Sequence, residues 1–486
     1  MASRVAGWVS RLDDAVGAAL EARIRRHHRQ RLANLGHGGI LQRSPARGDL
    51  WIPGRAPRAG NAIDVLIDGE HALAAIAAAI EDATSHVHIA GWHLSPDFRL
   101  RRDNGSATLR DLLAAVAERV DVRVLLWAGP PLPMFRPTRS MMKTVRRELT
   151  EGTNVHCALD ARERTLHCHH EKIVIVDDEV AFVGGIDLSD LSADRWDQTR
   201  HRPRGSTGWH DVATRLRGPI VADVAAHFRD RWQEVADAEL PIPVAPAPVG
   251  DVEIQLLRTV PEDTYRFAPR GEFSILDAYL RALSSASEFI YLENQFLWST
   301  EVVRVLADKL RRPPHPSFRI VLLLPARPSS GADTTRGQLG YLIDADNGAG
   351  RLLAATVNAH AGLRTSPLYV HAKVGIIDDR WLTIGSANLN EHSLFNDTEM
   401  NVLTQNADLA RNTRLRLWAE HLERPVADVD ADPVTIIDRL WKPLSEEQFA
   451  RSVNGDAPTH RLTRLAAVSR RSERLVGPTR GLLVDG

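Results

Sequence analysis

The chain of 486 residues has little cysteine, little lysine and no long hydrophobic run. Two cysteines, Cys157 and Cys168, are too few for a disulfide framework. No apolar stretch approaches the roughly 18 residues that a membrane-spanning helix needs. Asp13, Asp14 and Glu21 interrupt the apolar residues of the N-terminus, which argues against a signal peptide. We therefore expect a cytoplasmic protein without a membrane span.

The chain also lacks an excess of either charge. Its 61 basic and 62 acidic side chains give a formal net charge of -1. A nucleic-acid-binding protein usually carries a clear excess of positive charge, so we expect no nucleic-acid partner.

Two basic segments remain as candidates for contact with a membrane surface. Apolar residues at helical spacing predict an amphipathic N-terminal helix that ends in a basic stretch from Arg25 to Arg31. The C-terminal tail carries Arg461, Arg464, Arg470, Arg471 and Arg474. Each segment either binds an anionic lipid surface or forms an ordinary solvated face of the protein, and the sequence leaves both alternatives open.

A proline-rich segment divides the chain into two large parts. Residues 235–250 contain Pro241, Pro243, Pro246 and Pro248, which forbid a regular helix. The predicted organisation is an N-terminal basic helix and lead-in, a first lobe, this linker, a second lobe and a C-terminal extension. Their respective ranges are 1–60, 61–234, 235–250, 251–425 and 426–486.

The same order of elements is predicted on both sides of the linker. Each part begins with a helix and an apolar strand, followed by a β-branched strand, and each ends in a helix that contains a tryptophan. The ranges are 72–83, 87–92 and 122–127 in the first part, and 275–286, 289–296 and 318–324 in the second. This repeat predicts an α/β protein of two similar sandwich lobes with pseudo-two-fold symmetry and a site between them. Residues 134–147, 190–209 and 327–350 are expected to be long loops that select the substrate.

Each lobe contains the same short motif. His170 and Lys172 are followed by Asp177 and Gly184-Gly185, while His371 and Lys373 are followed by Asp378 and Gly385-Ser386, with identical spacings. The chain has only five lysines, and two of them belong to these motifs. A single His-x-Lys-x4-Asp match is expected by chance on the order of 0.01 to 0.02 times in such a chain, so two in register indicate function.

The motif residues suit chemistry at a phosphodiester. On an extended strand the histidine and the lysine share a face, so the two motifs together would place two imidazoles and two ammonium groups around one anion. One imidazole attacks phosphorus, and the other protonates the leaving oxygen and then activates water or an alcohol. Hydrogen bonds from Ser386, Asn388 and the backbone near Gly184, Gly185 and Gly385 would add to the charge of the lysines. This chemistry requires no metal and no cofactor.

Four further carboxylates receive distinct predicted roles. Asp211 and Glu399 occupy matching places in the repeats and are expected to orient the motif histidines, either within each lobe or across the interface. Asp177 and Asp378 stand at strand-to-turn junctions and are expected to be scaffold residues. Five other histidines match no standard zinc spacing, namely His86, His88, His93, His167 and His169.

Residues 170–177 (HEKIVIVD) and 371–378 (HAKVGIID) resemble the paired HKD motifs of the phospholipase D superfamily. Further segments are similar to phospholipase D proper: 181–188 (AFVGGIDL), Arg195-Trp196-Asp197, Trp209-His210-Asp211-Val212, Arg217-Gly218-Pro219, 290–296 (IYLENQF) and 384–390 (IGSANLN). The similarity runs from about Asp64 to Trp418.

The resemblance implies a bilobed α/β enzyme without a catalytic metal. Its donor would be a phosphatidylcholine-like phospholipid, and its acceptor water or an alcohol. The resemblance assigns the nucleophile and general acid to the motif histidines, with His170 as the nucleophile, and phosphate binding to Lys172, Lys373 and Asn388. One position departs from the repeat, because Asp187 stands where the second motif has Asn388. A carboxylate there would repel phosphate unless it is paired.

Two other activities use the same chemistry. A cardiolipin synthase-like transferase would pass the phosphatidyl group to a lipid alcohol, whereas a nuclease would line its groove with basic and aromatic residues. The net charge of -1 speaks against the nuclease.

Overall fold

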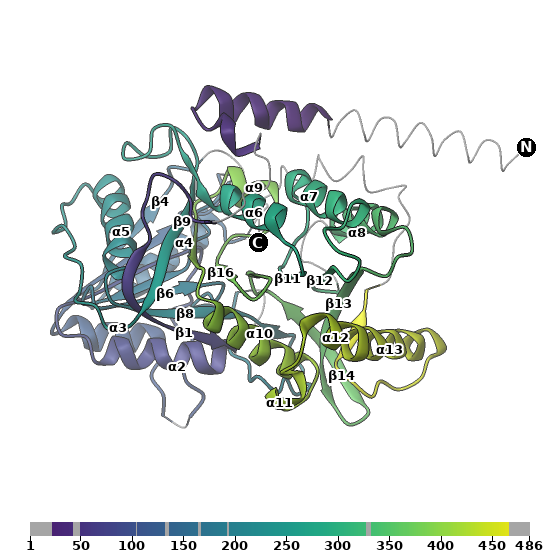
Figure 1. Ribbon diagram of the computed structural model, residues 1–486. Coiled ribbons are helices and arrows are strands. Elements are labelled where there is room, and N and C mark those ends of the chain that lie inside the picture. The colour runs from purple at the N-terminus through teal and green to yellow at the C-terminus, as the bar shows by residue number, and fades with distance from the viewer. Residues whose placement is uncertain are drawn as a thin grey trace, which may run out of the picture.

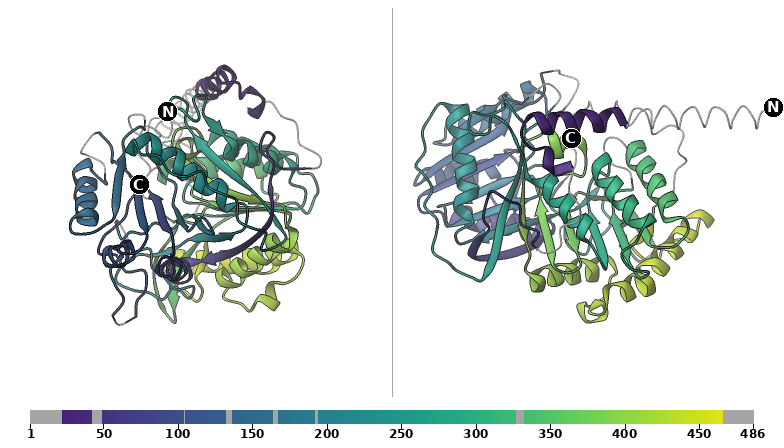
Figure 2. Two further views of the ribbon diagram at one scale, coloured as in Figure 1. Left: turned by 90° about the vertical axis from the view of Figure 1, so that its left-hand side faces the viewer. Right: turned by 45° about the horizontal axis from the view of Figure 1, so that its top comes forward.

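The structure is a computed structural model that describes residues 22–41, 49–103, 105–131, 136–163, 167–191, 194–326 and 332–465. Most of the predicted N-terminal amphipathic helix lies outside these residues, as do Arg470, Arg471 and Arg474. A helix over 22–34 and the 3-10 turn η1 (Gly38–Leu41) precede the main body. Two α/β lobes make up that body and lie side by side (Figure 1; Figure 2). Within the described residues, no helix has the length and apolar character to span a bilayer.

The first lobe is built on a mixed seven-stranded sheet. The strand order is β4 (His156–Asp160), β3 (Asp121–Trp127), β2 (His86–Gly91), β5 (Ile173–Val176), β6 (Val180–Gly184), β8 (Val212–Arg217) and β1 (Arg58–Ile67). The β2–β3 and β3–β4 pairs are parallel and the others antiparallel. All four residues of β5 are buried, which explains why this motif strand is a continuous apolar run.

The second lobe repeats this sheet strand for strand. Its order is β13 (Leu352–Ala361), β12 (Arg319–Leu323), β11 (Phe289–Glu293), β15 (Val374–Ile377), β16 (Trp381–Gly385), β17 (Glu399–Thr404) and β9 (Val252–Val260), with the same parallel and antiparallel pairs. Two short strands are added at the edges, β10 (Glu272–Phe273) on β9 and β18 (Leu462–Arg464) on β13. Strands β1 and β9 also pair with each other, which joins the two sheets.

Helices cover both faces of each sheet in matching positions. One face of the first sheet packs against α2 (Asp68–Glu81), α3 (Leu109–Ala117) and α4 (Arg139–Thr150), and the equivalent face of the second against α6 (Ser274–Ser285), α7 (Thr300–Arg311) and α8 (Ala332–Asp346). The opposite faces share one central core with α5 (Val221–Ala236) and α10 (Ala407–His421). The remaining elements are β7 (Gly208–His210), β14 (Arg364–Val370), α9 (Glu391–Phe395), α11 (Val426–Val429), α12 (Pro433–Ile436), the π-turn η2 (Ile437–Trp441) and α13 (Lys442–Asn454).

The predicted fold class, two similar α/β sandwich lobes, is confirmed, with two local differences. The His-x-Lys pairs do not lie within a strand, because β5 and β15 begin at the residue after each lysine. Two of the predicted loops are partly helical, since 134–147 overlaps α4 and 327–350 contains α8. Met142, Val145 and Leu149 are the buried residues of α4, and their spacing forms the apolar stripe of an amphipathic helix.

Candidate active site

The two motifs meet where the lobes face each other. Strand β7 of the first lobe pairs in parallel with β14 of the second, so that His210 lies opposite Val370. A bridge between His169 and Thr398 makes the equivalent connection in the other direction. Val370 and His210 directly precede His371 and Asp211. In the same way, His169 and Thr398 directly precede His170 and Glu399. The repeat therefore places each histidine next to a carboxylate of the opposite lobe.

The carboxylates that were expected to orient the histidines do contact them, in the crossed arrangement. His371 Nδ1 lies 2.6 Å from Asp211 Oδ2, and His170 Nδ1 lies 2.9 Å from Glu399 Oε1. Both contacts involve Nδ1, which leaves each Nε2 for chemistry. All four side chains are buried. A site of this form exists only when both lobes are present.

The lysines and Asn388 lie around these pairs. The ammonium groups of Lys172 and Lys373 donate to the carbonyls of their own motif histidines, His170 and His371. Gln295, two residues after the end of β11, accepts from Lys373 Nζ at 3.4 Å and from Asn388 Nδ2 at 3.3 Å. Gln295 therefore connects two of the groups that were predicted to bind phosphate.

Glycines are needed where β6 and β16 approach the neighbouring strands. A Cβ atom on Gly185 would collide with the carboxylate of Asp211, and one on Gly385 would collide with the side chain of Asn401. Gly184 has the same close approach to Ala213. These predicted scaffold glycines leave room for the strand that carries each carboxylate.

Ser386 stands in the place that Gly185 has in the first lobe, and its hydroxyl donates to Glu399 Oε2. Ser393 Oγ donates to Glu399 Oε1 at 2.5 Å. The hydroxyl of Ser386, which was expected to bind phosphate, is thus used in this structure to hold the carboxylate. Glu399 is fixed by two hydroxyls and Asp211 by the backbone N–H of Val212 at 2.8 Å.

The carboxylate of Asp187 is paired with cationic side chains, which offset the negative charge that would repel a phosphate. Its carboxylate lies 3.5 Å from Lys172 Nζ and 3.9 Å from a guanidinium nitrogen of Arg195. Arg195 stacks on the ring of Trp209 at 3.9 Å, and Trp209 packs against the ring of His371 with a centroid distance of 4.4 Å. Arg195 thus adds positive charge beside the first motif.

Burial and charge give the groups of the site unequal proton affinities. Burial, Lys373 and Arg195 lower the pKa of His371 well below its usual value. Burial raises the pKa of Asp211 to about 6 and lowers that of Lys373 to about 7. Although burial opposes ionisation of Glu399, the neighbouring His170 and its hydrogen bond lower the pKa of this carboxyl. Glu399 is therefore the carboxylate that stays ionised over the wider pH range.

Asp177 and Asp378 lie outside the site and stabilise turns through hydrogen bonds to backbone N–H groups. The carboxylate of Asp378 accepts from the backbone N–H groups of Ser287, Glu288 and Phe289 at 2.7 to 2.8 Å. Asp177 binds the backbone of Thr84, Ser85 and His86 in the same way. Both residues have positive φ, a conformation that aspartate tolerates in turns. Each ties the turn after its motif strand to the start of β11 or β2.

The five histidines without a predicted role do not gather into one cluster. His86 and His88 lie beside Asp178, and His167 lies near His392 and Asp397. His93 contacts Ser189, and His169 contacts Thr398.

Sequence reasoning missed Gln295 and His210 as site residues. Gln295 belongs to IYLENQF and His210 to WHDV, segments that were noted only as family resemblance. Gln295 lies near the end of the predicted strand 289–296, and His210 directly precedes Asp211. These positions were the signal in the sequence that pointed to the site.

The fold and the crossed pairs define a class of two-lobed proteins in which duplicated His-x-Lys motifs lie together between the lobes. The family description “Phospholipase D” matches residues 79–208, and “Cardiolipin synthase, PLD-like domain” matches residues 279–419. The chain belongs to the phospholipase D superfamily.

Curated relatives agree with this assignment. Phospholipase D A of Dictyostelium discoideum is 28% identical over 74% of this chain, and phospholipase D alpha 4 of Arabidopsis thaliana 26% identical over 71%. The matches cover 35% and 62% of those relatives, so the chain spans only part of their length. The crystal structure of phosphatidylserine synthase from Haemophilus influenzae has the same fold, with a TM-score of 0.53, 13% identity, and coverage of 82% of this chain and 96% of that chain.

Proposed function

We propose that the protein is a phospholipase D-type enzyme that transfers a phosphatidyl group from a phosphatidylcholine-like donor to water or an alcohol. The observation that carries the proposal is the crossed arrangement, in which the pairs His170–Glu399 and His371–Asp211 lie beside Lys172, Lys373 and Asn388. The names of the curated relatives support a phospholipid as the donor. The enzyme would act in the cytoplasm at a membrane surface.

The proposed reaction has two steps. In the first, Nε2 of one histidine attacks phosphorus while the other histidine protonates the leaving head-group oxygen, whose bond to phosphorus breaks. In the second, the deprotonated second histidine takes the proton of water or an alcohol, whose oxygen displaces the first histidine. Lys172, Lys373 and Asn388 stabilise the charge on the non-bridging oxygens in both steps. Asp211 and Glu399 keep the Nδ1 protons in place.

A cardiolipin synthase-like transferase is the second candidate. The match of residues 279–419 to the family described as “Cardiolipin synthase, PLD-like domain” favours it. Both activities use the same covalent intermediate and differ in the acceptor, because the transferase requires a lipid alcohol.

Product analysis separates these functions. The purified chain is incubated with phosphatidylcholine and increasing ethanol, and in parallel with phosphatidylglycerol alone or with DNA. We expect phosphatidic acid and phosphatidylethanol, with the ethanol product rising with ethanol concentration. Cardiolipin as the main product would establish the second candidate, and cleavage of DNA without phospholipid turnover would contradict both. His170→Asn serves as the control for contaminating activity.

A further inference from the structure

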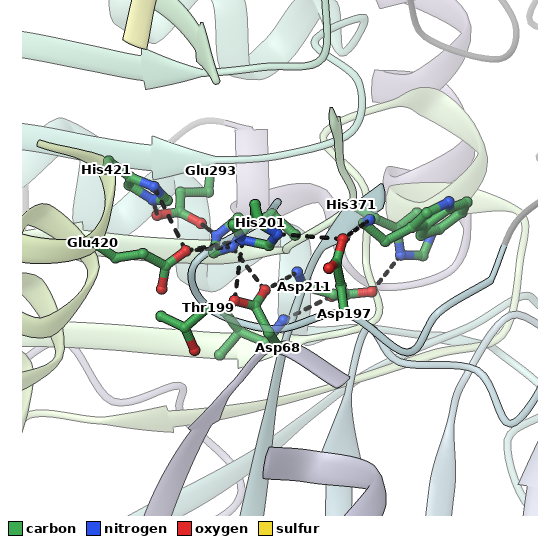
Figure 3. A network of polar contacts seen from close by, with 12 residues as sticks. Asp68, Asp197, Thr199, His201, Asp211, Glu293, His371, Glu420 and His421 are labelled. Atoms are coloured by element: carbon green, nitrogen blue, oxygen red, sulfur yellow. Dashed lines mark hydrogen bonds and ion pairs between the residues drawn. The ribbon is translucent and has the colours of Figure 1, made fainter. Parts of the chain in front are cut away.

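A buried cluster of charged side chains lies between the lobes, next to the site. We call it the interlobe cluster; it consists of Asp68, His201, His210, Glu293, Glu420 and His421. Asp68 begins α2 and His210 ends β7 in the first lobe, whereas Glu293 ends β11 and Glu420 and His421 belong to the end of α10. Figure 3 labels Asp68, His201, Glu293, Glu420 and His421, which lie beside Asp211 and His371. The reaction described above uses none of their side chains.

The ring of His210 has a carboxylate at each nitrogen. Nδ1 lies 3.0 Å from Asp68 Oδ1, and Nε2 lies 2.8 Å from Glu293 Oε2. An ionised carboxylate only accepts hydrogen bonds, so both ring nitrogens must carry protons and the ring is an imidazolium. Burial alone would lower the pKa of His210, but Asp68 and Glu293 raise it well above the usual value.

The other members of the interlobe cluster leave His210 protonated. Glu420 Oε1 lies 3.3 Å from Nδ1 of His210 and adds negative charge. Nε2 of His421 donates to Glu293 Oε1 at 2.9 Å. His201 lies between Asp68 and Glu420, each 3.1 Å from its Nε2, and also faces Asp197. The pKa values of Asp68 and Glu293 are held well below their usual range by the histidines, despite burial.

His227 provides a contrast elsewhere in the first lobe. Its Nε2 lies 2.7 Å from Glu171 Oε2, but its Nδ1 accepts from the guanidinium of Arg258 at 3.0 Å. A guanidinium only donates, so His227 must be neutral. Burial and Arg258 lower its pKa to about 3. Two equally buried histidines thus have opposite protonation states because of the groups that face their second nitrogen.

His210 is joined to the active site through two short paths. Its carbonyl accepts from the backbone N–H of His371 at 2.8 Å. Asp68 Oδ1, which holds the ring of His210, also accepts from the backbone N–H of Asp211 at 3.2 Å. The equivalent backbone contact at the first motif is made by Thr398, whose carbonyl accepts from the N–H of His170 at 2.9 Å. Threonine has no charged side chain, so the cation is present only on the His371 side.

We propose that His210 is a positioning residue: as an imidazolium between Asp68 of one lobe and Glu293 of the other, it fixes the Asp211–His371 pair. Glu293 lies two residues before Gln295, which contacts Lys373, so the same link sets the second-lobe side of the site. The protonated state of His210 rests on its two carboxylate contacts and on the ionised state of Asp68 and Glu293, whereas the effect on turnover rests on the proposed function.

A divalent metal ion is the competing occupant of the interlobe cluster. One ligand atom from each of Asp68, His201, His210 and Glu420 lies within 4.8 Å of the others. A metal bound to Nδ1 of His210 would replace the proton on that nitrogen. Stoichiometric metal that is present in the wild-type protein and in His227→Gln but absent from His210→Gln, measured by elemental analysis, would therefore overturn the proposal.

The same substitution at two histidines tests the proposal. Glutamine offers one donor group and one acceptor, so His227→Gln can satisfy both neighbours of His227, whereas His210→Gln cannot donate to two carboxylates. Nitrogen-15 spectra are recorded on the full chain with labelled histidine. The signals of His210 and His227 are identified because each set disappears in the corresponding variant. At pH 8 we expect two protonated nitrogens at His210 and one neutral tautomer at His227. A neutral His210 in the wild-type protein would overturn the proposal.

Two further readouts test positioning. The Nδ1 proton of His371, bonded to Asp211, should shift in His210→Gln and not in His227→Gln, a result that requires no substrate. With phospholipid, His210→Gln should lose kcat by about 10- to 100-fold, as for a lost buried charged hydrogen bond, with KM little changed. Since His210 lowers the pKa of Asp211, the acid limb of kcat/KM should move to higher pH. An unshifted His371 proton would contradict positioning, while an inactive wild-type protein would contradict only the proposed function.

Discussion

Replacing the two orienting carboxylates by their amides should have very different effects. In Asp211→Asn, the oxygen that accepts from the N–H of Val212 at 2.8 Å must stay an oxygen, so the new NH2 group takes the place of Oδ2. That NH2 then donates to Nδ1 of His371, 2.6 Å away in the wild-type pair. His371 must carry its proton on Nε2, the nitrogen needed for chemistry. A wrong tautomer of this kind costs about 10⁴-fold in a Ser-His-Asp triad, and we expect a similar loss in kcat.

Glu399→Gln can keep the correct tautomer. Its oxygen can remain at Oε1, where it accepts from His170 and Ser393, while its NH2 group donates to Ser386 Oγ. Ser386 can redirect its own proton to the carbonyl of Met400, which lies 3.3 Å away. Only the negative charge is lost, and a charged hydrogen bond contributes about 1.5–3 kcal/mol, or roughly 10- to 150-fold in kcat.

The assay is kcat at about pH 6.5, between the pKa values of Asp211 and Lys373, on a soluble short-chain phosphatidylcholine, with near-ultraviolet circular dichroism to confirm that both variants are folded. We expect Asp211→Asn to be at least about tenfold slower than Glu399→Gln, from the two ranges above. Equal losses, or a greater loss in Glu399→Gln, would refute the reasoning about which oxygen each amide must keep.

Three other predictions concern pH, the histidines and the scaffold. Asp211, with a pKa of about 6, must be ionised, and Lys373, with a pKa of about 7, must be protonated; a pH series of kcat/KM should therefore fall below about pH 6 and above about pH 7. Folded His170→Asn and His371→Asn should each lose at least about several hundred-fold in kcat on phosphatidylcholine, and near-normal rates in either would exclude a two-histidine mechanism. Asp378→Ala should lower the free energy of unfolding in urea by about 1.5–3 kcal/mol, because three backbone N–H groups lose a charged acceptor, with kcat little changed.

Helices and strands of both lobes could be predicted from the sequence because their apolar residues follow local periodic patterns. The predicted strands 122–127 and 318–324 correspond closely to β3 and β12, and the helix over 275–286 to α6. Helix α4 was missed because the apolar stripe of Met142, Val145 and Leu149 is sparse and a proline-containing segment precedes it. Strand and helix assignments follow local pattern, and a three-residue stripe is weak evidence.

The crossed pairing could not be chosen from spacing alone. Asp211 and Glu399 each follow the Gly-rich turn of their own motif, so pairing within a lobe and across the interface fit the sequence equally. The choice depends on β7 lying beside β14, a contact between segments more than 150 residues apart. The interlobe cluster was missed for the same reason, since Asp68, His210 and Glu293 belong to three separate segments and share no motif.

The identity of the nucleophile can be argued from the unequal carboxylates. A phosphohistidine ring carries positive charge when Nδ1 keeps its proton, so it needs a partner that stays ionised. Glu399, whose pKa is lowered, meets this need better than Asp211, whose pKa is raised to about 6. The carboxylates therefore favour His170 as the nucleophile. The lowered pKa of His371 leaves that ring neutral in the free protein, so the negative charge of the bound phosphodiester must raise its pKa before it can act as the acid.

A substrate that needs no acid separates the two roles. A p-nitrophenyl ester of phosphatidic acid loses p-nitrophenolate without protonation, because p-nitrophenol is far more acidic than an alcohol. His371→Asn should then complete the first step once, releasing about one equivalent of p-nitrophenolate per enzyme, and stall with the phosphatidyl group on His170, since no base activates water. His170→Asn should release none. Acid-labile label on the protein, mapped by mass spectrometry, identifies the modified ring. A burst from His170→Asn and none from His371→Asn would reverse the assignment.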